Sequence, residues 1–267
     1  MIRVVLIVVV LFLPLSPGNT AEPWASLKPI GKARVVSVVD GDTVIISPRV
    51  NGRNEVRLVG LQAPKLPLGR KNFPTWPLAH ESKAALAALT EGREISLYVA
   101  DSPVDRYGRH LAHLKRDDGL WIQGEMLRLG WARLYSFPDN RHAVTEMLAL
   151  EREARARGRG IWSHPNYAIR DPDALDGLEN RFELVQGRII AADVHKGTGY
   201  LNFGEDWRSD FTLVIRKRGL DLFKKAGIDI ESYGGQTVRA RGWLKSRNGP
   251  MIEITHPEQI EVLAPPG

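Results

Sequence analysis

A β-branched run interrupted by an acidic turn constrains the fold of this 267-residue chain more than any other feature. Residues 33–39 read Ala-Arg-Val-Val-Ser-Val-Val, the turn Asp-Gly-Asp-Thr occupies 40–43, and apolar residues resume at 44–46. β-branched residues favour strands, and Asp-Gly between two apolar runs predicts a hairpin. A third run at 55–60 continues the pattern. We therefore expect a three-stranded meander near the start of the folded chain.

Helical and strand patterns follow this meander in a fixed order. Apolar residues recur with helical spacing in three segments, and two further apolar runs separate the first of these helices from the others. Three strands, one helix, two strands and two helices fit a five-stranded barrel of the OB type. The sequence thus predicts an α+β, mainly β domain over residues 30–163. Its later elements are helices at 79–90, 121–130 and 143–157 and strands at 94–99 and 109–114.

A second, smaller domain is predicted behind a linker at residues 164–181, which is rich in Pro and acidic residues. Residues 182–264 contain β-type runs, one short helical segment at 219–226 and an Asn-Gly hairpin signal at 248–249. We interpret this domain as a second small OB-like β-barrel. Its aromatic residues are typical of a core, although nearby arginines leave room for base stacking. The expected strands are 182–194, 200–203, 211–215, 236–244, 251–254 and 260–263.

The first residues have the pattern of a bacterial secretory signal. Arg3 precedes an apolar run at 4–15, and small or turn-forming residues follow up to Ala21. The run is short for a bilayer span. We expect residues 1–21 to be a signal peptide that directs export to the periplasm or the exterior. The chain has no cysteine, which excludes disulfides and thiolate metal sites, and its formal charge of +6 favours anionic partners such as nucleic acid.

Four segments together resemble the staphylococcal-nuclease (thermonuclease) family. They are Val-Asp-Gly-Asp-Thr at 39–43, Val-Arg-Leu-Val-Gly-Leu-Gln-Ala-Pro-Lys at 56–65, Asp-Arg-Tyr-Gly-Arg at 105–109 and Gly-Arg-Gly-Ile-Trp at 158–162. The resemblance implies an OB barrel with three helices. It also implies calcium-dependent hydrolysis of phosphodiester bonds in DNA and RNA.

Carried over residue by residue, the resemblance makes Asp42 a metal ligand and Arg57 and Arg109 the phosphate-binding residues. Two positions depart from the family. Gln62 stands where the family has a second metal-binding Asp, and Lys65 stands where it has the catalytic Glu. Three acids would contribute −3, whereas Asp42, Gln62 and Lys65 contribute −1, 0 and +1. We therefore expect a weak or absent calcium site at Asp42 and Gln62, with Lys65 as a third phosphate-binding cation.

Three hypotheses stay open at this level. The chain is a nuclease relative that binds nucleic acid or another phosphodiester but cuts weakly or not at all. Alternatively, catalysis has moved to other groups, or the fold serves only to bind a partner in the cell envelope. Simpler interpretations compete with each motif: residues 40–43 as a plain turn, Arg57 as a structural partner of Asp42, and an arginine row at 152–159 as a solvated helix face. The candidates for relocated catalysis are Asp40, Glu55, Glu81, Asp105 and a nearby histidine, with His80, His110 and His113 interpreted as packing or surface residues.

Overall fold

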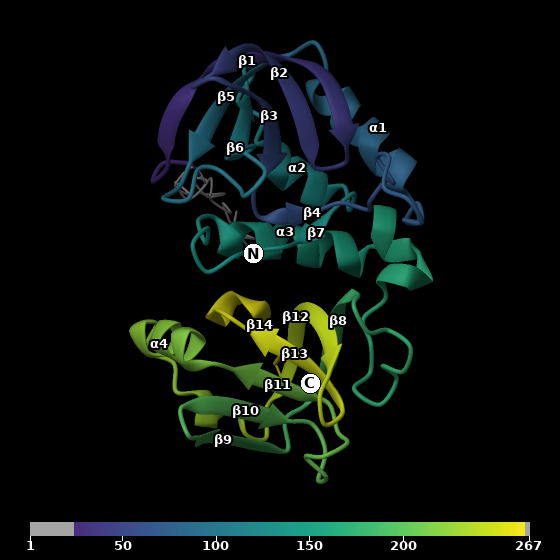
Figure 1. Ribbon diagram of the computed structural model, residues 1–267, viewed down its shortest axis with the longest axis vertical. Coiled ribbons are helices and arrows are strands. Elements are labelled where there is room, and N and C mark those ends of the chain that lie inside the picture. Colours follow the sequence, from purple (N-terminus) through teal and green to yellow (C-terminus); the bar gives the residue numbers. More distant parts are fainter. Residues whose placement is uncertain (1–23, 265–267) are drawn as a thin grey trace, which may run out of the picture.

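The structure, a computed structural model, describes residues 24–264. The predicted signal peptide at 1–21 lies outside these residues. Two units are stacked along the long axis, with a β-barrel at one end and a second sheet at the other (Figure 1). No helix within the described range has the length and apolar character to cross a membrane.

The first unit is a closed five-stranded barrel with the order β1-β2-β3-β6-β5. All neighbouring strands pair antiparallel except β3 and β6, which run parallel. This closure confirms the predicted OB-type barrel. The strands are β1 (Lys28–Asp40), β2 (Thr43–Val50), β3 (Arg53–Leu58), β5 (Glu94–Val99) and β6 (His110–Arg116).

Three α-helices accompany the barrel, as predicted. They are α1 (Ala79–Thr90), α2 (Ile122–Arg128) and α3 (Val144–Ala156), and each lies within two residues of its expected bounds. A short ladder between β4 (Leu61–Gln62) and β7 (Arg133–Leu134) ties the chain after β3 to the segment after α2. The barrel interior and the helices share one apolar core, because alternate strand residues face inward.

The predicted linker at 164–181 is packed against both units. Short 3₁₀ turns occupy Gly160–Ser163 and Pro165–Tyr167. The hydroxyl of Tyr167 donates to the carbonyl of Pro77 at 2.7 Å, and Leu175 is buried in the second core. The segment is therefore a fixed connection rather than a free tether.

The second unit is mostly β with one α-helix among its described residues, as expected. Its strands form a single seven-stranded sheet with the order β14-β12-β13-β11-β10-β9, and β8 pairs with β12. The elements are β8 (Phe182–Arg188), β9 (Ala191–His195), β10 (Thr198–Asn202), β11 (Thr212–Ile215), α4 (Lys217–Lys225), a 3₁₀ turn (Ile230–Tyr233), β12 (Thr237–Ser246), β13 (Pro250–Ile254), a 3₁₀ turn (Pro257–Gln259) and β14 (Ile260–Val262).

The predicted second closed barrel is not confirmed, because this sheet is open between β8 and β9. The gap is short. Ile189 donates its N–H to the carbonyl of Gln236 beside β12, and Ile190 donates to the carbonyl of Asn202 on β10. One bent strand, expected from the sequence as 182–194, thus runs from β12 to β10. The parallel pairing of β11 with β13 repeats that of β3 with β6 in the barrel.

A buried ionic cluster joins the two units, and it includes Arg155 of the arginine row. Arg241 on β12 contacts both carboxylate oxygens of Glu151 on α3 at 3.0 Å and also pairs with Glu261. Arg152 and Arg155 on α3 pair with Glu261 at 2.8 and 3.5 Å. Arg155 is 8% exposed and is the exception to the solvated-face interpretation, whereas Arg152 and Arg157 are 55% and 60% exposed, as that interpretation expects. A buried charge such as that of Arg155 needs carboxylate partners.

Candidate functional site

The acidic turn between β1 and β2 places one carboxylate deep in the domain. The Asp42 side chain is fully buried. One carboxylate oxygen accepts the backbone N–H of Ala63 at 2.9 Å, and the other accepts the Thr43 hydroxyl at 3.2 Å. A β-carbon on Gly41 would lie 2.0 Å from the Ser82 hydroxyl of α1, so only glycine allows the turn to pack so closely. The turn is therefore more than a connector, because α1 and β4 hold it in place.

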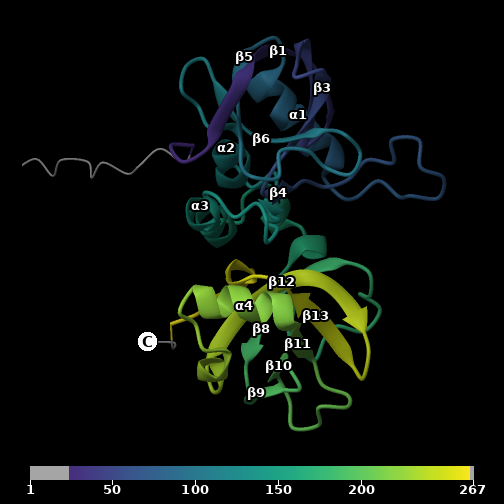
Figure 2. The ribbon, with the colours of Figure 1, turned by 60° about the vertical axis from the view of Figure 1, so that its left-hand side comes forward.

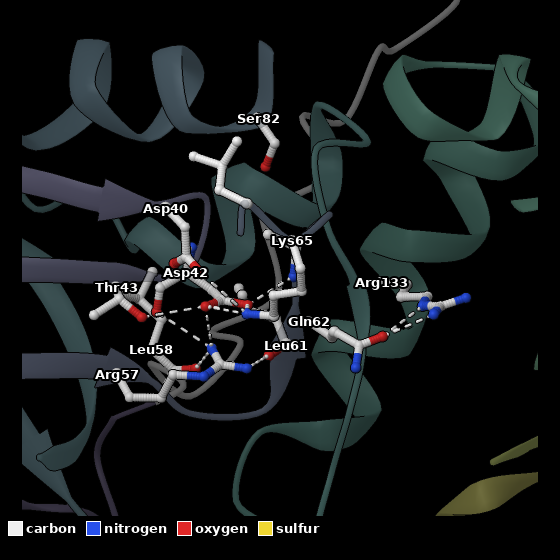
Figure 3. Close-up of polar contacts among 12 residues, drawn as sticks. Asp40, Asp42, Thr43, Arg57, Leu58, Leu61, Gln62, Lys65, Ser82 and Arg133 are labelled. Carbon is white, nitrogen blue, oxygen red and sulfur yellow. Dashed lines mark hydrogen bonds and ion pairs between the residues drawn. The ribbon is translucent and has the colours of Figure 1, made fainter. Parts of the chain in front are cut away.

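The ammonium of Lys65 binds the two aspartates of this turn (Figure 3). Its Nζ lies 2.7 and 2.5 Å from the carboxylate oxygens of Asp42 and 3.3 Å from Oδ2 of Asp40. Only 19% of the Lys65 side chain is exposed. The Lys65 ammonium, a monovalent cation, thus bridges the two carboxylates.

The two aspartates differ in their proton affinity. Burial alone would raise the pKa of Asp42, but Arg57 and Lys65 outweigh it and hold that pKa well below the ordinary value. Burial and the neighbouring charge of Asp42 raise the pKa of Asp40, and Lys65 only partly opposes them. Asp42 is therefore a fixed anion, whereas Asp40 is the easier of the two to protonate.

Arg57 on β3 completes the cluster around Asp42. Its Nη1 lies 3.1 Å from an Asp42 carboxylate oxygen and donates to the carbonyl of Leu58 at 2.9 Å, and its Nη2 donates to the carbonyl of Leu61 at 2.8 Å. An arginine has five N–H donors. Its Nε–H and one Nη2–H make no hydrogen bond with residues 24–264 and are left for a ligand. The structural pair with Asp42 is present, yet it leaves part of the guanidinium free.

Arg109 lies just before β6, which pairs with β3, and therefore reaches the same side of the barrel. Its Nε and Nη2 both lie 2.7 Å from a carboxylate oxygen of Asp105, and its Nη1 lies 3.8 Å from Glu55. The Tyr107 ring is 67% exposed and lies 5.4 Å from the Arg109 guanidinium. A phosphate at Arg109 would have to share the guanidinium with two acids.

Gln62 is turned away from the aspartates. Its Oε1 accepts from Nε and Nη2 of Arg133 at 3.0 and 2.7 Å (Figure 3). Arg133 is buried, and burial lowers its pKa to about 10. A buried guanidinium requires an acceptor, which explains the direction of the Gln62 side chain. The Gln62 oxygen is therefore directed at Arg133 in this structure, and the weak or absent metal site at Asp42 and Gln62 stays a prediction.

The calcium ion that the family resemblance implies does not fit these residues. Calcium takes about six to eight oxygen ligands with compensating negative charge. Here the Lys65 ammonium occupies both carboxylates, and the Gln62 oxygen is committed to Arg133. The part of the chain that the structure describes contains no group of three or more His, Cys, Asp or Glu side chains able to hold a metal.

A groove of about 960 Å³ opens beside this cluster. Its fixed charges are nearly balanced, so it would hold an anion by directed N–H donors rather than by a strong positive field. Tyr135, Phe137 and Tyr107 add aromatic surface to its wall. The charged lining residues are Arg57, Lys65, Arg70, Arg106 and Arg109 against Asp40, Glu55, Asp105 and Asp139.

The other sequence candidates divide between groove and interior. Glu55 and Asp105 line the groove, whereas Glu81 is exposed on α1 and does not line it. His113 is buried and accepts the Trp121 indole N–H at 3.3 Å, and burial lowers its pKa to about 3. His110 is buried as well and contacts the carbonyl of Val50 at 2.9 Å. These two histidines pack, as interpreted from the sequence.

Sequence reasoning missed Arg133 as the partner of Gln62. No local signal marks it, because the two residues are 71 positions apart. Arg70 lies in the segment between β4 and α1, and its guanidinium lies 3.5 Å from the Phe73 ring centroid. Arg70 lines the groove and Arg133 holds Gln62, and both contacts became visible only in three dimensions.

Known proteins resemble the first unit. Residues 55–164 match the family model of the staphylococcal nuclease homologues. The probable staphylococcal-like nuclease CAN2 of Oryza sativa subsp. japonica is 34% identical over 111 residues, 42% of this chain and 26% of the rice protein. An uncharacterized endonuclease of Escherichia coli O157:H7 is 30% identical over 131 residues, 49% of this chain and 76% of that protein. Endonuclease YhcR of Bacillus subtilis is 28% identical over 141 residues, 51% of this chain and 12% of that protein.

These matches differ in how much of each relative they cover. The chain spans about a quarter of the rice protein and about three quarters of the Escherichia coli endonuclease. The family model ends before β8, so the second unit lies outside it.

Proposed function

The chain belongs to the family of staphylococcal nuclease homologues, and we propose that it binds nucleic acid through the barrel groove while the Lys65 ammonium takes the place of a divalent cation. One observation carries this proposal. Nζ of Lys65 contacts three carboxylate oxygens of Asp40 and Asp42 at 2.5, 2.7 and 3.3 Å. Phosphodiester hydrolysis is then weak or lost.

The chemistry of the ammonium supports weak hydrolysis. Lys65 stands where the family has its general base, but an ammonium has no lone pair and cannot take a proton from water. It also repels a second cation from the two carboxylates that would bind one. The same substitution thus affects both the base and the metal site.

Binding of a phosphodiester relies on the donors that remain. Arg57 offers its Nε–H and one Nη2–H, and Arg109 can exchange its carboxylate partners for a phosphate of similar geometry. Nucleic-acid affinity should therefore fall with salt. About three neutralised phosphates on a single strand predict a slope of about −2 in log affinity against log salt.

A second candidate function is hydrolysis without a divalent cation. Glu55 is 41% exposed, lines the groove with Arg57 and lies 3.8 Å from Arg109. A carboxylate so placed is able to orient and deprotonate a water beside a phosphate that the arginines hold. Glu55→Gln would abolish cleavage under this hypothesis and leave it unchanged under the first.

Calcium titration by calorimetry, with a nuclease assay on DNA and RNA in parallel, tests the proposal. The native protein should show no saturable calcium binding and little cleavage, yet bind a single-stranded oligonucleotide. Lys65→Glu combined with Gln62→Asp should create calcium binding and raise cleavage, and Lys71→Glu, the same charge reversal as Lys65→Glu on an exposed residue, should not. Tight calcium binding with brisk cleavage by the native protein would contradict the proposal. Neither binding nor cleavage would favour a purely structural role.

We also propose that the protein is exported. The support is the basic and apolar pattern of residues 1–21. N-terminal sequencing of protein recovered from outside the cytoplasm should begin near residue 22. An intact Met1 on a soluble cytoplasmic pool would refute this.

A further inference from the structure

A second groove lies on the sheet of the second unit, away from the barrel. Its volume is about 560 Å³, which is within the usual range for ligand pockets. The strands β9 and β10 that form its floor lie at the far end of the molecule from the barrel (Figure 2). The lining residues are Asp193, His195, Tyr200, Asn202, Trp207, Thr212, Val214, Arg216, Arg247, Asn248 and Met251.

The floor of this groove is the outer face of the sheet. Along β10 and β11, Leu201 and Leu213 are buried in the core, while Tyr200 and Asn202 on alternate positions line the groove. Tyr200 pairs directly with Val214 across the strands. In OB-type sheets this region of the second and third strands, with the adjoining loops, is the face that takes oligonucleotides or oligosaccharides.

Two loops frame the groove and are packed on each other. One joins β10 to β11 and carries Trp207, and the other joins β12 to β13 and carries Arg247. A β-carbon on Gly249 would lie 2.6 Å from the carbonyl oxygen of Asp210, which shows how closely the loops approach. The Asp210 carboxylate also accepts the N–H of Gly204 at 2.9 Å. The frame is therefore preformed, which lowers the cost of ordering it around a ligand.

The side chains of the groove suit an anionic ligand with flat rings. The indole of Trp207 is 52% exposed, and the Arg208 guanidinium lies 4.4 Å from its ring. The guanidinium of Arg247 makes no hydrogen bond or ion pair with any residue in the described range. Among residues 24–264, Arg216 pairs with Glu253 alone, at 3.4 Å. Aromatic faces stack on bases, and exposed arginines bind the phosphates between them.

We propose that this groove binds a single-stranded segment of nucleic acid, with Trp207 and Tyr200 stacking on bases and Arg247 and Arg216 contacting phosphates. Asp193 is the one acid among the lining residues, against two arginines and His195. This charge balance favours a nucleic acid over a neutral sugar chain. The protein then has two separate sites for nucleic acid, one on each unit. The second does not depend on the proposed function of the first.

Fluorescence anisotropy with a labelled oligothymidylate of about 12 nucleotides tests the site on the full-length protein. Trp207→Ala should weaken binding about tenfold or more, because each stacked base contributes strongly to affinity. Trp207→Phe keeps an aromatic face and should bind nearly as the native protein does. Arg218→Ala removes one positive charge from exposed α4 and is the matched control for Arg247→Ala, which removes one from the groove.

Separate variants keep the two sites distinguishable. Arg109→Ala weakens only the barrel groove, so the binding that it leaves should weaken further, again by about tenfold or more, when Trp207→Ala is added. Arg247→Ala, on an exposed loop, repeats the test if Trp207→Ala folds poorly. Unchanged oligonucleotide binding in both Trp207→Ala and Arg247→Ala would overturn the proposal. The proposal would also be overturned if the native protein bound a neutral oligosaccharide and Trp207→Ala lost that binding while it still bound the oligonucleotide.

Discussion

Replacing Lys65 with methionine removes the ammonium from the acidic turn and keeps most of the side-chain volume. Nζ lies 2.7 Å from one oxygen of Asp42, so at an effective dielectric of about 20 the attraction is roughly 6 kcal/mol. Loss of rotamer entropy offsets up to about 2 kcal/mol of it, and desolvation offsets more. Because 19% of the Lys65 side chain is exposed, we expect Lys65→Met to lower the free energy of unfolding by about 3 kcal/mol. This value is the low end of the range for a broken buried ion pair.

The loss should depend on pH. Asp42 has a lowered pKa in the folded protein, so its contribution to stability is present at neutral pH and is lost as the pH falls. Without Lys65, the carboxylate pair has a higher affinity for a proton, and protonation of Asp40 relieves the repulsion. The difference in unfolding free energy between Lys65→Met and the native protein should therefore be greatest near pH 7 and shrink toward about pH 4.

Urea unfolding at several pH values measures this difference, and Lys71→Met is the matched control on an exposed position. Calcium should stabilise the Lys65→Met variant more than the native protein. With a Kd of about 1 mM and about 10 mM calcium the gain would be about 1.4 kcal/mol. A loss below about 1 kcal/mol that does not change with pH would refute the view that Lys65 is the cation of this cluster.

Three further outcomes follow from the packing. Gly41→Ala should destabilise the barrel by about 1–3 kcal/mol in thermal unfolding, because the new methyl group would lie 2.0 Å from a buried serine hydroxyl of α1. Arg241→Met should cost about 3–5 kcal/mol by urea unfolding, since it strips buried carboxylates of their partner. Burial raises the pKa of Glu261, but Arg241 and the neighbouring arginines hold it at about 2. As the pH falls, the native protein should therefore keep its stability below pH 4, whereas Arg241→Met should already lose stability at a higher pH. Trypsin should first cut the exposed loop at Arg70 or Lys71 rather than between the two units, and an early interdomain cut would show that the connection is looser than its packing indicates.

The sequence alone determined the local elements of both units. The run at 33–46 with its Asp-Gly turn formed the expected hairpin, because β-branched alternation and turn residues act through neighbouring backbone geometry. Helical spacing located α1, α2 and α3 to within two residues. The departures at Gln62 and Lys65 were also readable, since they change residue charge at a position set by the motif.

Only the tertiary structure decided which groups meet. Lys65 reaches Asp42 across 23 residues, and Gln62 turns to Arg133 across 71, because each buried charge takes the nearest acceptor that the fold supplies. Arg155 of α3 belongs to a row interpreted as a solvated face, yet it is covered because Glu261, more than 100 residues later, pairs with it. Burial and partner choice are set by packing between distant segments, and a one-dimensional pattern does not carry that information.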